Sequence, residues 1–125
     1  MKDIKKARRY LGNAKAILLE KATNEDGSYD DRKYVKMAGK KAYAAVLASL
    51  DAVLGTHKKD SISIDCYEKE RSAIDQNMLA YFDAAYDTLA LAMGYDGNLS
   101  VGVSNAGIGV AEKIVGWAEQ KTKAL

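Results

Sequence analysis

The sequence predicts an all-α protein, folded as an antiparallel up-and-down four-helix bundle that occupies residues 1–125 as one domain. Three observations carry this prediction. Apolar residues recur at spacings of three and four in four separate segments, as they do on the buried stripe of a helix. The chain contains no proline, so long helices can run without their usual breaker. Short polar or glycine-containing stretches join the segments, which makes each sequential pair of helices antiparallel.

The first two helices are predicted on either side of a turn-forming run at residues 24–27. Asp3 is the expected N-cap of the first helix, whose stripe is Ile4, Ala7, Leu11, Ala14, Leu18 and Ala22. The second helix should begin near Ser28, because Ser28 and Asp31 resemble a capping box with Asp in place of the usual Glu. Its stripe is Val35, Ala38, Ala42, Ala45 or Val46, Ser49 and Val53, and Gly55 follows as a C-cap.

The third predicted helix starts at Ser63 or Asp65 and ends at Gly94. Its stripe is Tyr67, Ile74, Met78, Phe82, Ala85, Leu89 and Ala92. Such a helix would be longer than its neighbours, so we expect a kink, a loosened turn or an overhang, with residues 75–77 as the candidate position. The fourth stripe is Val101, Ile108, Ala111, Ile114, Val115 and Ala118.

Four glycines lie within the fourth predicted helix, at positions 102, 107, 109 and 116. Each glycine lowers helix stability by about 1 kcal/mol relative to alanine, so we expect these glycines to serve a structural or functional purpose. Close helix packing is the preferred interpretation. An anion site at a flexible helix start is the alternative, but no Lys or Arg lies between Arg71 and Lys113 to complete one.

The sequence lacks the residues that several classes of function require. A di-iron or di-manganese bundle needs inward-facing Glu and Glu-x-x-His ligands, whereas the single histidine, His57, falls in a connection. A Cys-His or Ser-His-Asp site has no scaffold, and no phosphate-binding glycine loop is present. We therefore expect no cofactor and no catalytic residues. The single cysteine, Cys66, and the absence of a long apolar run favour a cytoplasmic protein without a membrane span.

Charge is distributed unevenly along the chain. Residues 1–59 contain 14 Lys or Arg and 7 Asp or Glu, whereas residues 60–125 contain 5 and 10. One interpretation is a phosphate-binding face made of Lys5, Arg8, Arg9, Arg32, Lys33, Lys36 and Lys40. The other is neutralisation within the fold. An even antiparallel register between the second and third helices sets Lys36 opposite Asp83 and Arg32 or Lys33 opposite Asp87, which predicts structural ion pairs there.

Several short motifs recur along the predicted helices: Tyr10-Leu11 with Ala14-Lys15, Ala42-Tyr43, the run 50–54, Ala85-Tyr86-Asp87 with Leu89, and Gly94-Tyr95-Asp96-Gly97. These motifs resemble the HEPN (higher eukaryotes and prokaryotes nucleotide-binding) superfamily, in particular its small bacterial members. The resemblance implies a helical bundle and paired protomers. Many members are ribonucleases with an Arg followed by a His near the last helix. This chain has no histidine after His57 and no arginine after Arg71, so that activity is not carried over.

Two functions from different classes follow. The leading hypothesis is a non-catalytic module for protein interaction or dimerisation, with a homodimer or a nucleotidyltransferase as the partner that the resemblance implies. The alternative is an RNA- or nucleotide-binding protein that uses the basic N-terminal hairpin. An enzyme with an unrecognised site ranks third.

Overall fold

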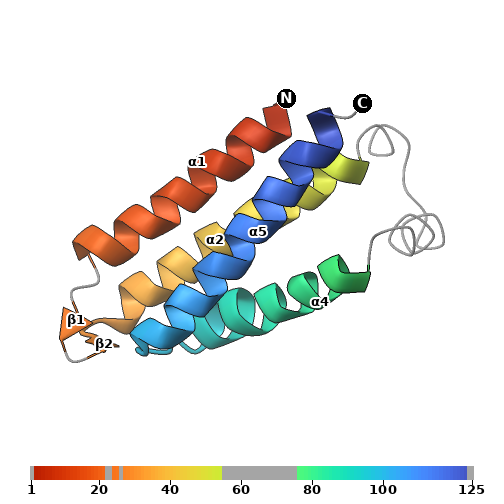
Figure 1. The fold of residues 1–125 in the computed structure, drawn as a ribbon. Coiled ribbons are helices and arrows are strands. Elements are labelled where there is room, and N and C mark those ends of the chain that lie inside the picture. Colours follow the sequence, from red (N-terminus) through yellow and green to blue (C-terminus); the bar gives the residue numbers. More distant parts are fainter. Residues whose placement is uncertain (1, 22–23, 26, 55–75, 124–125) are drawn as a thin grey trace.

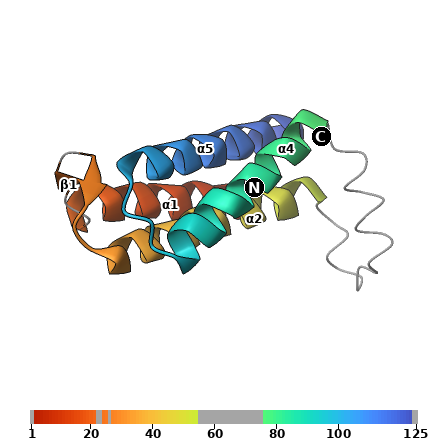
Figure 2. The same ribbon diagram turned by 90° about the horizontal axis from the view of Figure 1, so that it is seen from below.

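The computed structural model describes residues 2–21, 24–25, 27–54 and 76–123. In chain order its elements are α1 (Lys2–Ala16), η1 (Ile17–Lys21), β1 (Asn24–Glu25), β2 (Ser28–Tyr29), α2 (Arg32–Leu54), α4 (Gln76–Ala85), η3 (Tyr86–Tyr95) and α5 (Val101–Lys123), where η marks a π-helix. The helices form four rods that lie side by side, with α4 and η3 making the third rod (Figures 1 and 2). The predicted all-α four-helix bundle is confirmed.

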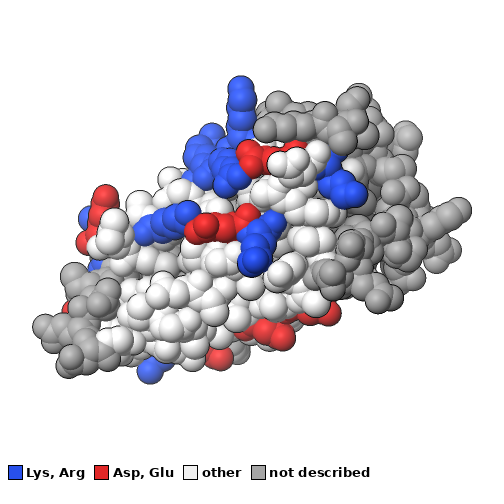
Figure 3. All heavy atoms as spheres, viewed as in Figure 1, with Lys and Arg blue, Asp and Glu red and all other residues white. Residues whose placement is uncertain are grey.

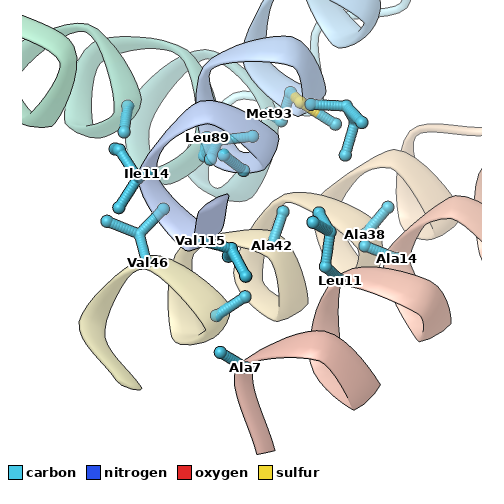
Figure 4. Close-up of a cluster of buried hydrophobic side chains, with 14 of the residues drawn as sticks. Ala7, Leu11, Ala14, Ala38, Ala42, Val46, Leu89, Met93, Ile114 and Val115 are labelled. Carbon is cyan, nitrogen blue, oxygen red and sulfur yellow. The ribbon is translucent and has the colours of Figure 1, made fainter. Parts of the chain in front are cut away.

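The core is built from small and branched aliphatic side chains of all four rods. Figure 4 shows Leu11 of α1, Ala42 of α2 and Val115 of α5 pointing into the space between the helices, where they share one buried cluster with Leu89 and Ile114. Of the predicted stripe residues, those that are buried are Ile4, Ala7, Leu11, Ala14, Val35, Ala38, Ala42, Ala45, Val46, Ser49, Met78, Ala85, Leu89, Ile108, Ala111, Ile114, Val115 and Ala118. Helical periodicity therefore identified most of the inward-facing residues. Of the predicted stripe residues, Leu18, Val53, Phe82, Ala92 and Val101 are only partly buried, and the stripes missed the buried Met93, Ala48 and Ala52.

The start of α2 differs from the prediction. Ser28 lies in β2, where it pairs with Glu25, and it makes no capping box with Asp31. Instead α2 begins at Arg32, and the Oδ1 atom of Asp31 accepts a hydrogen bond of 2.9 Å from the backbone N–H of Lys33. The reason is the hairpin: with a φ of 79°, Gly27 supplies the left-handed backbone conformation that a tight turn needs, so the chain stays extended through Tyr29.

The hairpin is tied to the start of α5. The backbone N–H of Tyr29 donates to the carbonyl of Leu99 at 2.8 Å, and that of Val101 donates to the carbonyl of Gly27 at 3.0 Å. The Tyr29 side chain is buried in the main core. The hairpin lies where α1 and η1 end and α5 begins (Figure 1). It therefore closes one end of the bundle.

The third rod contains a loosened segment at 86–95. Of the predicted position at 75–77, residue 75 lies outside the described residues, and residues 76 and 77 begin the regular helix α4. The π-helix η3 covers Tyr86–Tyr95 and runs one residue past Gly94, the predicted helix end. The rod ends at Gly97, whose φ is 64° and whose N–H donates to the Met93 carbonyl at 2.9 Å. The predicted helix start at Ser63 or Asp65, the stripe residues Ala22, Tyr67 and Ile74, and the C-cap Gly55 lie outside the described residues.

Glycines allow close contact between helices, at a place that the sequence did not single out. A Cβ added at Gly39 of α2 would lie 2.6 Å from the Met93 Cβ and 2.7 Å from the backbone N of Gly94. In α5, a Cβ at Gly107 would lie 2.8 Å from Cδ2 of Leu89. Close packing therefore explains Gly107. It does not explain Gly109 or Gly116, which face open space, or Gly102, whose nearest neighbour is the Ser100 hydroxyl at 3.5 Å.

Candidate interaction surfaces

The register between α2 and the third rod corrects the predicted ion pairs. Arg32 lies against the turn after η3, where its guanidinium donates to the carbonyls of Asp96 and Gly97 at 3.4 and 3.3 Å. A Cβ at Gly97 would also lie 3.1 Å from Cε of Lys36. Arg32 thus faces Gly97 in place of Asp87, a displacement of ten residues. The same displacement takes Lys33 away from Asp87 and Lys36 away from Asp83.

Backbone contact fixes this register. Gly39 and Gly94 let α2 and η3 approach until main-chain atoms touch, and one such contact determines which residues face each other along both helices. The aromatic rings of Tyr43 and Tyr86 follow the same register, with centroids 6.0 Å apart. The prediction had instead assumed an even fold-back across residues 55–63, which lie outside the described ranges.

In the part of the chain that the structure describes, ion pairs join α1 to α5. Arg8 pairs with Glu119, and Lys15 Nζ lies 2.8 Å from Glu112 Oε1. The hydrogen bond that the Arg8 guanidinium donates to the Glu119 carboxylate raises the pKa of Arg8 above its ordinary value, and this effect outweighs the lowering by partial burial. Figure 3 shows basic and acidic side chains alternating over this face. The basic N-terminal half is thus partly neutralised within the fold, by partners other than the predicted ones.

The seven residues of the predicted phosphate-binding face do not form one track. Arg8 points toward α5 and Arg32 toward the Gly97 turn. Lys33 lies over the ring of Tyr34, with Nζ 5.6 Å from the centroid, whereas Lys40 lines a groove between α1 and α2. The exposed Lys5 and Arg9 lie on α1, and Lys36 lies beside Gly97. The predicted set is therefore divided among several faces.

A different group of cations gathers around Tyr10 of α1. The Lys41 Nζ lies 5.0 Å from the centroid of its ring, the Arg9 guanidinium carbon 5.5 Å and the Lys6 Nζ 5.7 Å. We call these four residues the Tyr10 cluster. Of its three cations, only Arg9 belongs to the phosphate-binding face predicted from the sequence. The signal that the prediction missed is that Lys6 is four residues from Tyr10, so both lie on one helix face.

The Tyr10 cluster borders an open groove of about 370 Å³ between α1 and α2. Its lining residues are Tyr10, Ile17, Met37, Lys40, Lys41 and Ala44. A second groove, of about 360 Å³, lies beside the hairpin and over Gly109. Its lining is mostly apolar, and the Lys15–Glu112 ion pair borders it. Within the described residues, each groove lies between helices at the surface of the bundle.

Large apolar side chains are exposed along η3. Tyr86 is 48% exposed, Leu91 40% and Tyr95 76%. Because a π-helix has i→i+5 hydrogen bonds and about 4.4 residues per turn, residues spaced by five and four share one side of it. Leu47 of α2, 45% exposed, lies one turn from Tyr43, whose ring contacts Tyr86. We call Tyr86, Leu91 and Tyr95 the η3 stripe.

The described residues contain no group of His, Cys, Asp and Glu side chains that could hold a metal ion. His57 and Cys66 lie outside them. None of the helices in the described part of the chain is both long and apolar enough to cross a membrane.

Comparison with known proteins gives a family. No curated protein matches the chain. A solved structure, a protein of unknown function from Dyadobacter fermentans, is 40% identical over 96% of this chain and 95% of that chain, with a TM-score of 0.81. The family model described as Domain of unknown function (DUF5618) matches residues 2–120. Since that match covers nearly the whole bundle, the chain belongs to the DUF5618 family.

Proposed function

We propose that this protein is a non-catalytic interaction module that forms a homodimer through the η3 stripe. The observation that carries the proposal is the exposure of Tyr86, Leu91 and Tyr95 on one side of a π-helix. Aromatic side chains are enriched at protein interfaces because they bury much area at a small cost in conformational entropy. A second copy of the chain would remove this apolar surface from water.

The π-helix supports an interface for a second reason. With the roughly 3.6 residues per turn of an α-helix, positions 86, 91 and 95 would point in different directions. The wider turn of η3 aligns them, although it replaces the more favourable α-helical hydrogen bonds. π-helical segments frequently occur at functional sites, so a gain in binding offers a reason for this one.

Charges beside the η3 stripe suit a two-fold arrangement. The α2 side carries Lys36 and Lys40, and the η3 side carries the exposed Asp87. In an isologous dimer the same patch meets its own copy, so basic residues of one protomer can face acidic residues of the other. This complementarity favours a second copy over an unrelated partner as the occupant.

Light scattering on the purified protein tests the dimer. We expect twice the 13.6 kDa chain mass for the parent protein and the single-chain mass for Leu91→Glu, because a carboxylate at the centre of the stripe would be buried without a partner. Leu19→Glu is the matched control, since Leu19 is 84% exposed on η1 and outside the stripe. A parent protein that stays monomeric at high concentration, or a Leu91→Glu variant that stays dimeric, would contradict the proposal.

The remaining hypotheses stay predictions. The resemblance to the HEPN superfamily still implies a nucleotidyltransferase as a further partner, and the missing Arg and His pair still predicts no ribonuclease activity. RNA or nucleotide binding through the basic hairpin gains less support, because Lys5, Arg8, Arg9, Arg32, Lys33, Lys36 and Lys40 fall on several faces. The cytoplasmic location also stays a prediction, because the fold does not test it.

A further inference from the structure

We propose that the groove between α1 and α2 binds a small amphipathic anion, a medium-chain alkyl group that ends in a carboxylate or a phosphate. The groove is lined by none of the residues of the η3 stripe, although Lys40 lies between the two surfaces, so this proposal goes beyond the dimer. Its volume of about 370 Å³ falls at the lower end of the range of small-molecule sites, which is roughly 300 to 1,000 Å³.

The groove has two chemically different ends. Tyr10 and Ile17 lie seven residues apart on the α1 side, a separation of about 10 Å at the helical rise per residue. Lys41 lies over the Tyr10 ring, so that end is cationic. Met37 lies four residues before Lys41 on α2, toward the Ile17 end of the antiparallel pair. One end therefore offers charge and the other offers apolar surface.

Lys40 and Lys41 line the groove, and two further cations, Arg9 and Lys6, lie near the Tyr10 ring that borders it. Lys41, Arg9 and Lys6 each lie within 6 Å of the centre of one aromatic ring. Cations gathered in this way repel one another, and an anion bound among them would relieve that repulsion. The lining residues include two lysines and no carboxylate, so the groove itself supplies no counter-charge. A single anionic head group matches this end.

The apolar end favours an alkyl chain over a nucleobase. Ile17 and Met37 present flexible aliphatic and thioether surface, and methionine adapts readily to an irregular apolar ligand. A base would need a free aromatic face for stacking, whereas three cations already lie near the Tyr10 ring. The groove therefore fits a tail at Ile17 and Met37 and a head group at Lys41.

Titration calorimetry with four ligands that share a ten-carbon chain tests the proposal on the folded, full-length protein. Below their micelle concentrations, decanoate or decyl phosphate should bind saturably with a Kd of roughly 0.1 to 1 mM. Decanol and decyltrimethylammonium should bind at least about tenfold more weakly, because they lack the negative charge. The tighter of the two anions identifies the head group.

Variants assign the binding to this groove. Lys41→Gln should weaken binding of the preferred anion about fivefold to tenfold with little effect on decanol, and Met37→Asp should weaken all four ligands. Lys113→Gln is the matched control, because Lys113 also lies over a tyrosine ring, that of Tyr81 at 5.6 Å, but outside the groove. Circular dichroism would confirm that each variant is folded.

Three results would overturn the proposal. The first is equal affinity for decanoate and decyltrimethylammonium, and the second is a Lys41→Gln variant that binds the anion as well as the parent does. The third is a single-stranded oligouridylate that binds more tightly than either alkyl anion and displaces it with strong salt dependence, which would make the groove part of a nucleic-acid surface.

Discussion

The bundle joins its helices in two different ways. Between α2 and η3, glycines bring main-chain atoms into contact, and the Cβ position of Gly39 lies 2.7 Å from both the backbone N of Gly94 and the carbonyl of Leu89. Between α1 and α5, long charged side chains of Arg8 and Glu119 reach across the surface. The first contact tolerates almost no change in shape. The second depends on solution conditions, because partly exposed charges are screened by salt.

The comparison shows that a glycine in a helix has to be interpreted from its neighbours. Gly39 and Gly107 lie where an added methyl group would clash, whereas Gly109 and Gly116 face open space. The physical effect of replacing them should therefore differ in sign. Sequence alone gives all four the same propensity cost of about 1 kcal/mol.

Gly39→Ala should give the largest effect on stability. Its methyl group would meet main-chain atoms of η3 that cannot rotate away, so we expect a loss of about 2 to 4 kcal/mol, even after the gain in helix propensity. Urea denaturation followed by circular dichroism measures the free energy of unfolding. Gly109→Ala is the matched control and should gain about 0.5 to 1 kcal/mol. Equal effects of the two variants would show that the close contact does not exist.

Gly107→Ala should have an intermediate effect. Its methyl group would meet side-chain atoms, Cδ2 of Leu89 at 2.8 Å and Oγ1 of Thr88 at 3.1 Å, and the leucine can shift by rotation. We expect a loss of about 1 kcal/mol in the same denaturation experiment, because helix propensity partly offsets the clash. Pairing Gly107→Ala with Leu89→Val, which shortens the obstructing side chain, should recover part of the loss from the glycine substitution. If the effects of the two substitutions on the free energy of unfolding simply add, the strain caused by Gly107→Ala does not come from contact with the Leu89 side chain.

The sequence predicted which residues are inside but not how the rods align. The burial of Leu11, Val35 and Ile114 follows from helical periodicity alone, because a helix in water must bury its apolar stripe. Register depends on contacts between residues far apart in the chain. Gly39 and Gly94 supply the contact that fixes it, and no local signal distinguishes them from other glycines.

The candidate surfaces were predicted only in part for the same reason. A count of charges identified the basic half of the chain and named Arg9 and Lys40. It could not place Lys41 beside Tyr10, because that contact joins two helices. The η3 stripe depends on a π-helix, whose longer repeat is absent from the α-helical template used to find stripes. Tyr86 fell beside the predicted core stripe, whereas the structure leaves it about half exposed.

The α1–α5 contact should show the smallest effects, and salt should reveal them. A double-mutant cycle on Arg8→Ala and Glu119→Ala should give a coupling of about 0.5 to 1 kcal/mol at low salt, since these side chains are 47% and 29% exposed. The cycle on Lys15 and Glu112, which are 49% and 48% exposed, should give about 0.2 to 0.5 kcal/mol.

Raising the salt concentration to about 1 M shortens the Debye length to about 3 Å and should reduce both couplings by half or more. The loss caused by Gly39→Ala should stay the same at both salt concentrations, because steric overlap with Met93 and Leu89 involves no charge. Salt-independent coupling between Arg8 and Glu119 would mean that packing of the arginine stem, and not its charge, holds α1 against α5. In that case both helix contacts, that of α2 with η3 and that of α1 with α5, would depend on steric packing.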